Sequence, residues 1–393
     1  YRLVVGTDSA RVVAGQGDAW DTGLMASDVI SARYAGIPLK PRTRYYWQVA
    51  VTDETGRKAL SDVAYFETGK MGVDAWQGNW ISDHHDCKHQ PAPYFRKKFS
   101  VGKPVRSARI YVAVAGLYQL HLNVTYDVTS AIKQNENVVG IVLGNGWYNH
   151  QPLAVWNFEM APWRNRPAFC MDLHLTYEDG SEETVCTDYG WRTTDGGAWR
   201  KNNIYTGEFY DFSMQMEGWD KPGYDDSKWG GVRLRQAPSA QVTSQQMRPI
   251  RACREYPAVK FAQLSDNAYL YDFGYNMAGV TRFRLKGAKG TVVKVRHGER
   301  LGKDGRLDQS NIDVYYRGDK ETDPFQTDVL TLSGGEDEFM ARFNYKGFRY
   351  AQVEASAPIE IDKESMVACF VHSDVPQVGE VRSSNKLIEG LMA

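Results

Sequence analysis

Three histidines and a cysteine crowd into one short segment of the chain. His84, His85, Cys87 and His89 all lie within the stretch DHHDCKH, residues 83–89. Imidazole nitrogen and thiolate sulfur are ligands that zinc and related transition metals prefer. The sequence offers no second ligand pair at a suitable spacing, so we expect a solvated loop here rather than a metal site.

Carboxylates elsewhere could serve as general acids or bases. Neighbouring carboxylates occur at 225–226 and at 336–338, but turn-forming residues surround both stretches, so we expect solvated loops there. His297 and Glu299 stand two residues apart in RHGERL, and strand alternation places both on the face of Val295. We interpret them as a structural pair or as part of an interface with a domain that this chain lacks.

Aromatic side chains gather in the segment 144–167, GNGWYNHQPLAVWNFEMAPWRNRP. A ring in a long connection between strands needs a reason to be exposed, and stacking on the apolar face of a sugar is one. Packing down onto the underlying sandwich is the alternative, and the sequence leaves both open. The candidate sugar-binding rings are Trp147, Tyr148, Trp156 and Trp163.

Two acidic residues of TGEFYDF, Glu208 and Asp211, complete the candidate sugar-binding set. Carboxylate oxygens can accept hydrogen bonds from sugar hydroxyls or ligate a metal. A purely structural hydrogen-bonding role is the alternative that we favour for both.

Composition and charge narrow the class of protein. The 393 residues carry a formal net charge of −1 without a polybasic block, so we expect no nucleic-acid partner. No apolar run approaches the roughly 20 residues that span a bilayer. Five widely spaced cysteines without a C-x-x-C motif indicate core thiols, although Cys170 and Cys186 could meet across a hairpin.

The hydrophobic pattern predicts a mainly β chain of tandem antiparallel sandwiches. Residues 1–70 resemble part of a fibronectin type III module that opens in mid-strand, so we expect the natural N-terminus to lie further upstream. Residues 74–245 alternate as a jelly roll, with Met171, Leu173 and Leu175 inward before a turn at Asp179–Gly180.

The last third of the chain predicts a second sandwich over 246–372, where Phe283 and Leu285 oppose flanking arginines. The segment 373–393 then turns helical after the capping residue Asn385.

The join at Asn123–Val124 in the central region is irregular, because a predicted strand runs directly into VTYDVTS without a polar turn. We expect residues to be missing at that join, which makes its glycosylation sequon an artefact.

Several motifs together resemble the bacterial α-L-rhamnosidases of glycoside hydrolase family 78. The resemblance spans about 74–393 in consistent order, and its most specific parts lie in the second sandwich. The motifs that carry it are YDVTSAIKQNENVVGIVLGNGWY, NNIYTGEFYDFSMQMEGWDKPGYDDSKWGGV, YDFGYNMAGVTRFRLKGAKGTVVKVRHGERL, FNYKGFRY and VHSDVPQVGEVRSSNKLIEGL.

The resemblance implies a jelly roll and a concanavalin-like sandwich that precede an (α/α)6 barrel, whose first helix would be SSNKLIEGLMA. In this family the barrel carries the general acid and general base of an inverting hydrolysis of terminal α-L-rhamnosides. No position of this chain matches either catalytic motif, so we carry none over and expect the fragment alone to be inactive. Its implied partners are a rhamnose-containing glycan and its own missing helical domain.

The family resemblance also bears on cofactor and compartment. Hydrolysis needs no cofactor, but some family members use calcium in a rhamnose-binding module of the central region. A bacterial enzyme of polysaccharide degradation is expected in the periplasm or outside the cell.

Two other functions stay open from the sequence. The chain could be a stand-alone carbohydrate-binding or adhesion module. It could also be the front end of another glycosidase family, although a TIM barrel would then begin with a strand rather than with the helix predicted after Asn385.

Overall fold

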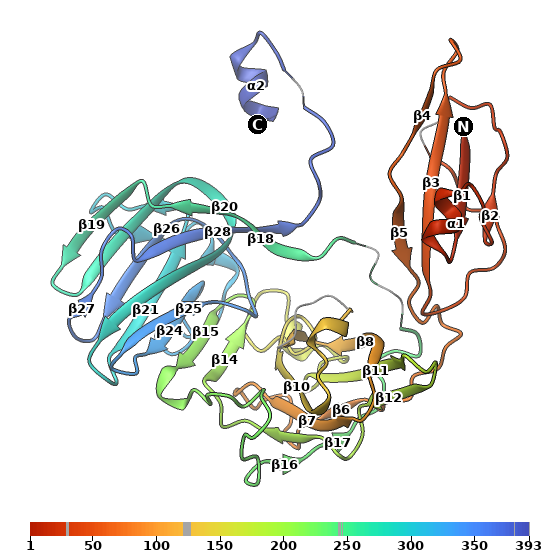
Figure 1. The fold of residues 1–393 in the computed structure, drawn as a ribbon. Helices are drawn as coiled ribbons and strands as arrows, with labels where there is room; N and C mark the ends of the chain where they lie inside the picture. Colours follow the sequence, from red (N-terminus) through yellow and green to blue (C-terminus); the bar gives the residue numbers. More distant parts are fainter. Residues whose placement is uncertain (29–30, 121–126, 243–244, 246, 381, 393) are drawn as a thin grey trace. The chain divides into compact units, whose positions relative to one another are not determined.

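The computed structural model of the chain describes residues 1–28, 31–120, 127–242, 245, 247–380 and 382–392. The chain forms two compact units, Tyr1–Gln77 with Ser239–Ser244, and Gly78–Pro238 with Gln245–Ala393. We describe each unit by itself (Figure 1). The unusual join at Asn123–Val124, with its sequon, lies outside the described residues.

The first unit is a small antiparallel β-sheet with a short helix. Its described strands follow the order β2-β1-β3-β4, with β5 also paired to β3, and Tyr45 lies in its core. The helix α1 begins after Asp8, whose side chain accepts hydrogen bonds from the backbone N–H groups of Ala10 and Arg11. The elements are β1 Arg2–Gly6, α1 Ser9–Val13, β2 Trp20–Asp21, β3 Arg44–Thr52, β4 Lys58–Leu60 and β5 Ala64–Glu67.

The central sandwich of the second unit packs two sheets face to face. One described sheet has the order β16-β13-β7-β10-β9, and the other has the order β12-β11-β6-β17 with β8 paired to β11. Their strands are β6 Ile81–Ser82, β7 Tyr94–Val101, β8 Val105–Ala115, β9 Leu117–Leu120, β10 Asn135–Gly144, β11 Ala168–Tyr177, β12 Glu182–Cys186, β13 Arg192–Thr194, β16 Gly230–Gly231 and β17 Arg233–Leu234.

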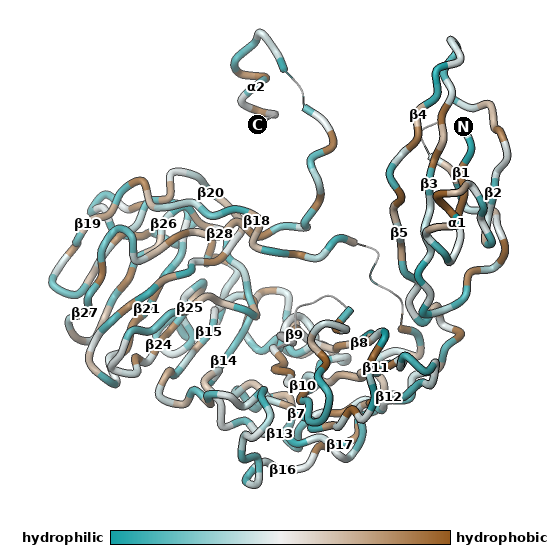
Figure 2. Tube along the Cα trace, in the orientation of Figure 1, coloured by the Kyte–Doolittle hydropathy of each residue, from teal (hydrophilic) through white to brown (hydrophobic). Residues whose placement is uncertain are grey.

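The core of this sandwich follows the predicted alternation. Met171, Leu173 and Leu175 are fully buried, and apolar stretches mark the strands of this region in Figure 2. Cys186 lies opposite Asp172 in the β11–β12 ladder, so it does not face Cys170. All five cysteines are free thiols in the described chain, but only Cys170 and Cys369 are buried as the core-thiol interpretation predicts.

A large curled sheet dominates the rest of the second unit. Within the described residues its path is β14-β15-β24-β21-β26-β20-β28-β18, and β20 also pairs with β19, β25 and β27. The strands are β14 Trp199–Asn203, β15 Gly207–Asp211, β18 Ile250–Pro257, β19 Lys260–Ser265, β20 Ala268–Gly287, β21 Val292–Gly298, β24 Thr327–Thr331, β25 Glu336–Met340, β26 Lys346–Ala355, β27 Ile359–Glu360 and β28 Met366–Ser373.

The long strand β20 explains how this sheet folds over itself. Its first half pairs with β26 and its second half with β25 and β28, which encloses Phe283 and Leu285 as predicted.

The carboxylates at 336–338 lie on strand β25 rather than in a loop, and Asp337 is buried. The prediction of a solvated loop for that stretch is therefore wrong.

The hairpin β14–β15 joins the large sheet although the sequence pattern places it in the jelly roll. Strand β15 pairs in parallel with β24, a contact between segments about 120 residues apart. A Cβ at Gly207 would lie 2.2 Å from the carbonyl oxygen of Thr327, so only glycine permits this approach. The domain boundary expected near residue 245 stays a prediction.

The chain ends in the predicted helix, α2 Lys386–Met392. Asn385 accepts a hydrogen bond from the backbone N–H of Leu387 at 3.0 Å, as expected of a capping residue. Leu387 and Leu391 are 72% and 77% exposed. Among the described residues no helix has the length and apolar character needed to span a membrane.

Candidate functional site

Aromatic rings from three segments form one surface, which we call the aromatic patch. It comprises Trp147, Trp156, Phe158, Tyr205 and Tyr315, linked by ring-centroid distances of 5.3–6.5 Å. Trp147, Trp156 and Tyr315 are 47%, 49% and 54% exposed. Exposed, mutually supported rings of this kind offer apolar faces to a ligand.

The patch contains only part of the predicted aromatic set. Trp147 and Trp156 belong to it, whereas Tyr148 is half-buried, and burial raises its pKa. Trp163 is 57% exposed and shows no ring contact within the described chain. Tyr205 and Tyr315 join the patch from other segments, and no local sequence signal marked them.

Backbone contacts hold the two loops of the patch together. The N–H of Val155 donates to the carbonyl of Tyr315 at 3.0 Å, and the N–H of Arg317 donates to the carbonyl of Leu153 at 2.9 Å. The segment 310–317 belongs to the second sandwich and includes the 3-10 turn Asp313–Tyr315. The patch is therefore a fixed feature of the unit rather than one flexible loop.

Buried polar atoms lie directly behind the patch. The ring of His150 stacks on Trp147 at 5.5 Å, and both of its nitrogens lack a hydrogen-bonding partner among the described residues. The side-chain amide of Asn203 and the hydroxyl of Thr206, on either side of Tyr205 in the sequence, are likewise buried without a hydrogen-bonding partner among the described residues. Burial lowers the pKa of His150 to about 4, so the ring is neutral near pH 7.

Glu208 lies at the junction of the two sandwiches, and its surroundings favour a structural role. It is fully buried, and its carboxylate accepts hydrogen bonds from the Trp199 indole at 2.7 Å and the Phe343 N–H at 2.6 Å. The Arg342 N–H and the Asn344 amide also donate to it. Burial, with the nearby charge of Asp328, raises the pKa of Glu208 to about 7.

A buried ion pair completes what we call the seam network, which comprises Trp199, Glu208, Asp328, Asn344 and Lys346. The Lys346 ammonium donates to both carboxylate oxygens of Asp328 at 2.9 Å and also to the Asn344 amide oxygen. Asp328 in turn accepts from the backbone N–H of Glu208 at 3.0 Å. Every charge in this network therefore has a partner inside the protein.

Other polar residues singled out in the sequence also have structural partners. Asp211 accepts hydrogen bonds from the Ser213 N–H and hydroxyl, at 2.9 and 2.6 Å, and so caps a 3-10 turn. His297 is buried against Thr281 at 2.8 Å, and Glu299 contacts Asn311 at 3.1 Å instead of the histidine. Of the two alternatives for His297 and Glu299, the structural pair does not form, and the role in an interface stays a prediction. The sugar-binding roles of Glu208 and Asp211 stay predictions.

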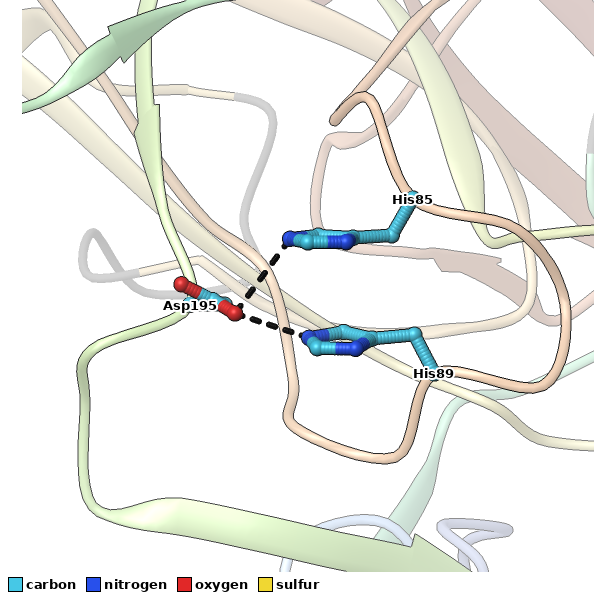
Figure 3. Close-up of side chains that lie close together, drawn as sticks. All are labelled: His85, His89 and Asp195. Atoms are coloured by element: carbon cyan, nitrogen blue, oxygen red, sulfur yellow. Dashed lines mark hydrogen bonds and ion pairs between the residues drawn. The ribbon is translucent and has the colours of Figure 1, made fainter.

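The histidine-rich segment meets a carboxylate from a distant loop, in what we call the loop cluster of His85, His89 and Asp195. The two imidazole rings stack at 3.6 Å with an angle of 10°, and both Nε2 atoms point at one carboxylate oxygen of Asp195 (Figure 3). The distances are 3.3 Å from His85 and 2.7 Å from His89. Burial lowers the pKa of His89 despite the opposing effect of its hydrogen bond to Asp195.

Among the described residues, this cluster is the group of histidine, cysteine and acidic side chains that converges closely enough to hold a metal. Two imidazoles and one carboxylate do not fit calcium, which takes six to eight oxygen ligands. The calcium expectation for the central sandwich therefore gains no ligand set here and stays a prediction.

Three domain models match the chain in sequence order. Residues 1–72 match the Rha78A-like N-terminal immunoglobulin domain, in the place of the predicted fibronectin-like module. Residues 124–254 match the α-L-rhamnosidase N-terminal domain, and residues 262–372 match the bacterial α-L-rhamnosidase concanavalin-like domain. The order defines a class: tandem β-sandwich domains associated with glycoside hydrolases.

Individual relatives support the same class of protein as the domain models. The chain is 30% identical over 413 residues to an α-L-rhamnosidase of Alteromonas sp. (strain LOR), covering 95% of this chain and 43% of the relative. The α-L-rhamnosidase of Dictyoglumus thermophilum shares 29% identity with a TM-score of 0.85, over 98% of this chain and 46% of that one. The structure of Streptomyces avermitilis α-L-rhamnosidase complexed with L-rhamnose has 22% identity and a TM-score of 0.87, over 99% and 55%.

These matches identify the chain as an N-terminal region of the bacterial α-L-rhamnosidase family. The chain spans less than half the length of the curated relatives it matches. The mainly β fold with immunoglobulin-like and concanavalin-like domains is thereby confirmed.

Proposed function

We propose that the intact protein hydrolyses terminal α-L-rhamnose from glycosides or polysaccharides by inversion, and that this chain is its non-catalytic β-sandwich portion. The observation that carries the proposal is the ordered match of three rhamnosidase domain models together with 30% identity over 95% of the chain. The substrate class follows from the names of those relatives.

Three carboxylates of the chain have structural partners that favour a non-catalytic role. An inverting hydrolase needs two carboxyl groups flanking an open site. Asp226 instead forms an ion pair with the buried Arg96, and Asp337 accepts from the hydroxyl of Ser333 at 2.7 Å. Glu208 is enclosed at the seam. Each has its acceptor capacity committed to protein donors.

The test compares two proteins on an aryl α-L-rhamnoside. The chain of 393 residues and the product of the complete reading frame are assayed side by side, and the anomer first released is identified by NMR. We expect turnover only from the longer product, with the inverted anomer. Activity that co-purifies with the 393-residue chain would overturn the proposal.

A second proposal is that the aromatic patch binds the rhamnose-containing glycan. Stacking rings next to polar groups suit a sugar, which has apolar faces and hydroxyls. The unpaired polar atoms of His150, Asn203 and Thr206 are buried behind the rings, so a sugar hydroxyl would reach them only if the rings move apart. A stand-alone carbohydrate-binding module would need the same surface.

Titration with L-rhamnose, followed by tryptophan fluorescence, tests the patch. We expect Trp147→Ala to abolish saturation and Trp163→Ala, which replaces a similarly exposed tryptophan outside the patch, to retain it. Equal loss in both variants would contradict a role specific to the patch.

Two further experiments test the expectations for calcium and for localisation. Repeating the titration with EGTA tests whether calcium is needed for rhamnose binding. Cell fractionation tests whether the intact protein is exported to the periplasm or beyond.

A further inference from the structure

We propose that His85, His89 and Asp195 bind one divalent transition-metal ion of the zinc type. Neither the family matches nor the hydrolytic function requires this site. The proposal rests on three donor atoms that the fold brings to one point from loops 106 residues apart.

The three donor atoms lie close enough together to reach one ion after a small rearrangement. Bonds of about 2.0–2.2 Å around a tetrahedral zinc ion place neighbouring ligand atoms roughly 3.3 Å apart. The His85 Nε2 lies 3.3 Å from the Asp195 oxygen, and the His89 Nε2 lies 2.7 Å from it, in a hydrogen bond. Binding requires that hydrogen bond to open by a few tenths of an ångström and the stacked rings to splay.

The backbone around the histidines is held in place before any metal arrives. The carbonyl of His85 accepts from Arg235 at 2.9 Å, and the carbonyl of His89 accepts from Arg166 at 2.8 Å. Arg166 is itself buried and paired with Asp83. Such support lowers the entropy lost when a ligand set closes around an ion.

The opposite loop is supported in the same way. The carbonyl of Asp195 accepts from the Arg200 guanidinium at 2.8 Å, which fixes the connection between β13 and β14. The metal would therefore act as a clip between two ordered loops, one after β6 and one before β14.

The chemistry of the ligand set selects the metal. Two imidazoles and a carboxylate are typical ligands of zinc, cobalt, nickel and copper, whereas calcium and magnesium prefer oxygen alone. Three protein ligands leave one tetrahedral position for water or another ligand. His85 is 44% exposed at its side chain, so this open position faces solvent.

The experiment titrates the untagged 393-residue chain with ZnCl2 by calorimetry and with CoCl2 by visible absorption. We expect one equivalent of each metal to bind, with cobalt giving the intense d–d spectrum of a tetrahedral site. His85→Ala and His89→Ala should each weaken zinc binding at least tenfold, and Asp195→Asn should weaken it less. His84→Ala is the matched control because that exposed histidine adjoins the cluster without belonging to it.

A thermal melt of each variant without metal shows whether the fold is retained, and zinc should raise the melting temperature of the wild type but not of His89→Ala. The absence of saturable zinc and cobalt binding by the folded wild type would overturn the proposal. Equal loss of affinity in His84→Ala and His85→Ala would overturn it as well.

Discussion

The seam network and the loop cluster both gather ionisable groups from distant segments, yet their surroundings differ. Glu208 reaches partners 134–136 residues away, and His89 reaches Asp195 across 106 residues. In the seam every charge is buried and accepts or donates inside the protein. In the loop cluster the groups are partly exposed and point at one shared oxygen.

The difference shows that burial, more than the types of residue, decides what a polar cluster does. A buried network that is fully paired stabilises one arrangement of the two sandwiches, and losing one member leaves an unpaired charge. An exposed cluster gains little stability from its contacts but keeps its donor atoms available to a ligand.

The largest expected effect comes from Lys346→Met. Both partners of the Lys346–Asp328 pair are 1% exposed, so the substitution leaves a buried carboxylate without its countercharge. We expect a loss of roughly 3–5 kcal/mol in the stability of the second unit, measured by urea denaturation. Lys286→Met is the control, because Lys286 and Glu360 are 55% and 73% exposed and water screens their contact, so its loss should cost far less. Similar losses in both variants would contradict the comparison.

Glu208→Gln should change how stability depends on pH. The pKa of Glu208 in the folded protein, about 7, lies above its value of 4.5 in a model compound. Its contribution is therefore fully present below pH 4.5 and is lost as the pH rises through 7. At about 1.4 kcal/mol per pKa unit, this amounts to roughly 3 kcal/mol.

Melting temperatures of the wild type and Glu208→Gln between pH 5 and pH 8 test this. The wild type should lose more stability than the variant as the pH rises over that range. The variant should also start from a lower stability, because an amide nitrogen cannot accept the hydrogen bond that a carboxyl oxygen accepts from the Trp199 indole. Parallel curves would show that Glu208 stays in one protonation state throughout.

Trp199→Phe removes one hydrogen bond from the seam and should have a smaller effect. The indole N–H donates to Glu208 at 2.7 Å, and its loss leaves one carboxylate oxygen without that donor, at a cost of about 2 kcal/mol. Trp229→Phe removes similar ring area from the same apolar cluster but keeps all four donors to Glu208. Denaturation midpoints that fall equally in both would indicate packing rather than the hydrogen bond.

The sequence predicts the sandwiches because their signal is local. Alternating apolar residues such as Met171, Leu173 and Leu175 specify an inward face without reference to the rest of the chain. The placement of β14–β15 has no such signal. Its parallel pairing with β24 depends on a partner about 120 residues away and on close approach at Gly207.

The residues of the candidate sites also differ in whether a local sequence signal marks them. Trp147 and Trp156 are recognisable because aromatic residues in a long connection stand out by themselves. Tyr315 and Asp195 are not, since each becomes relevant only when tertiary contacts bring its loop to the segment it completes. The histidine-rich segment looked like an isolated loop for this reason: its third potential ligand follows β13.

The smallest expected effect on stability is that of Asp195→Asn, and it completes the comparison. The side chain is 37% exposed, and an asparagine oxygen can still accept a hydrogen bond from His89. Without added metal we therefore expect a change below about 0.5 kcal/mol in the stability of the second unit, within the range of exposed sites. A loss comparable with that of Lys346→Met would mean that the loop cluster stabilises the fold as the seam does, and that its exposed donor atoms are not held for a ligand.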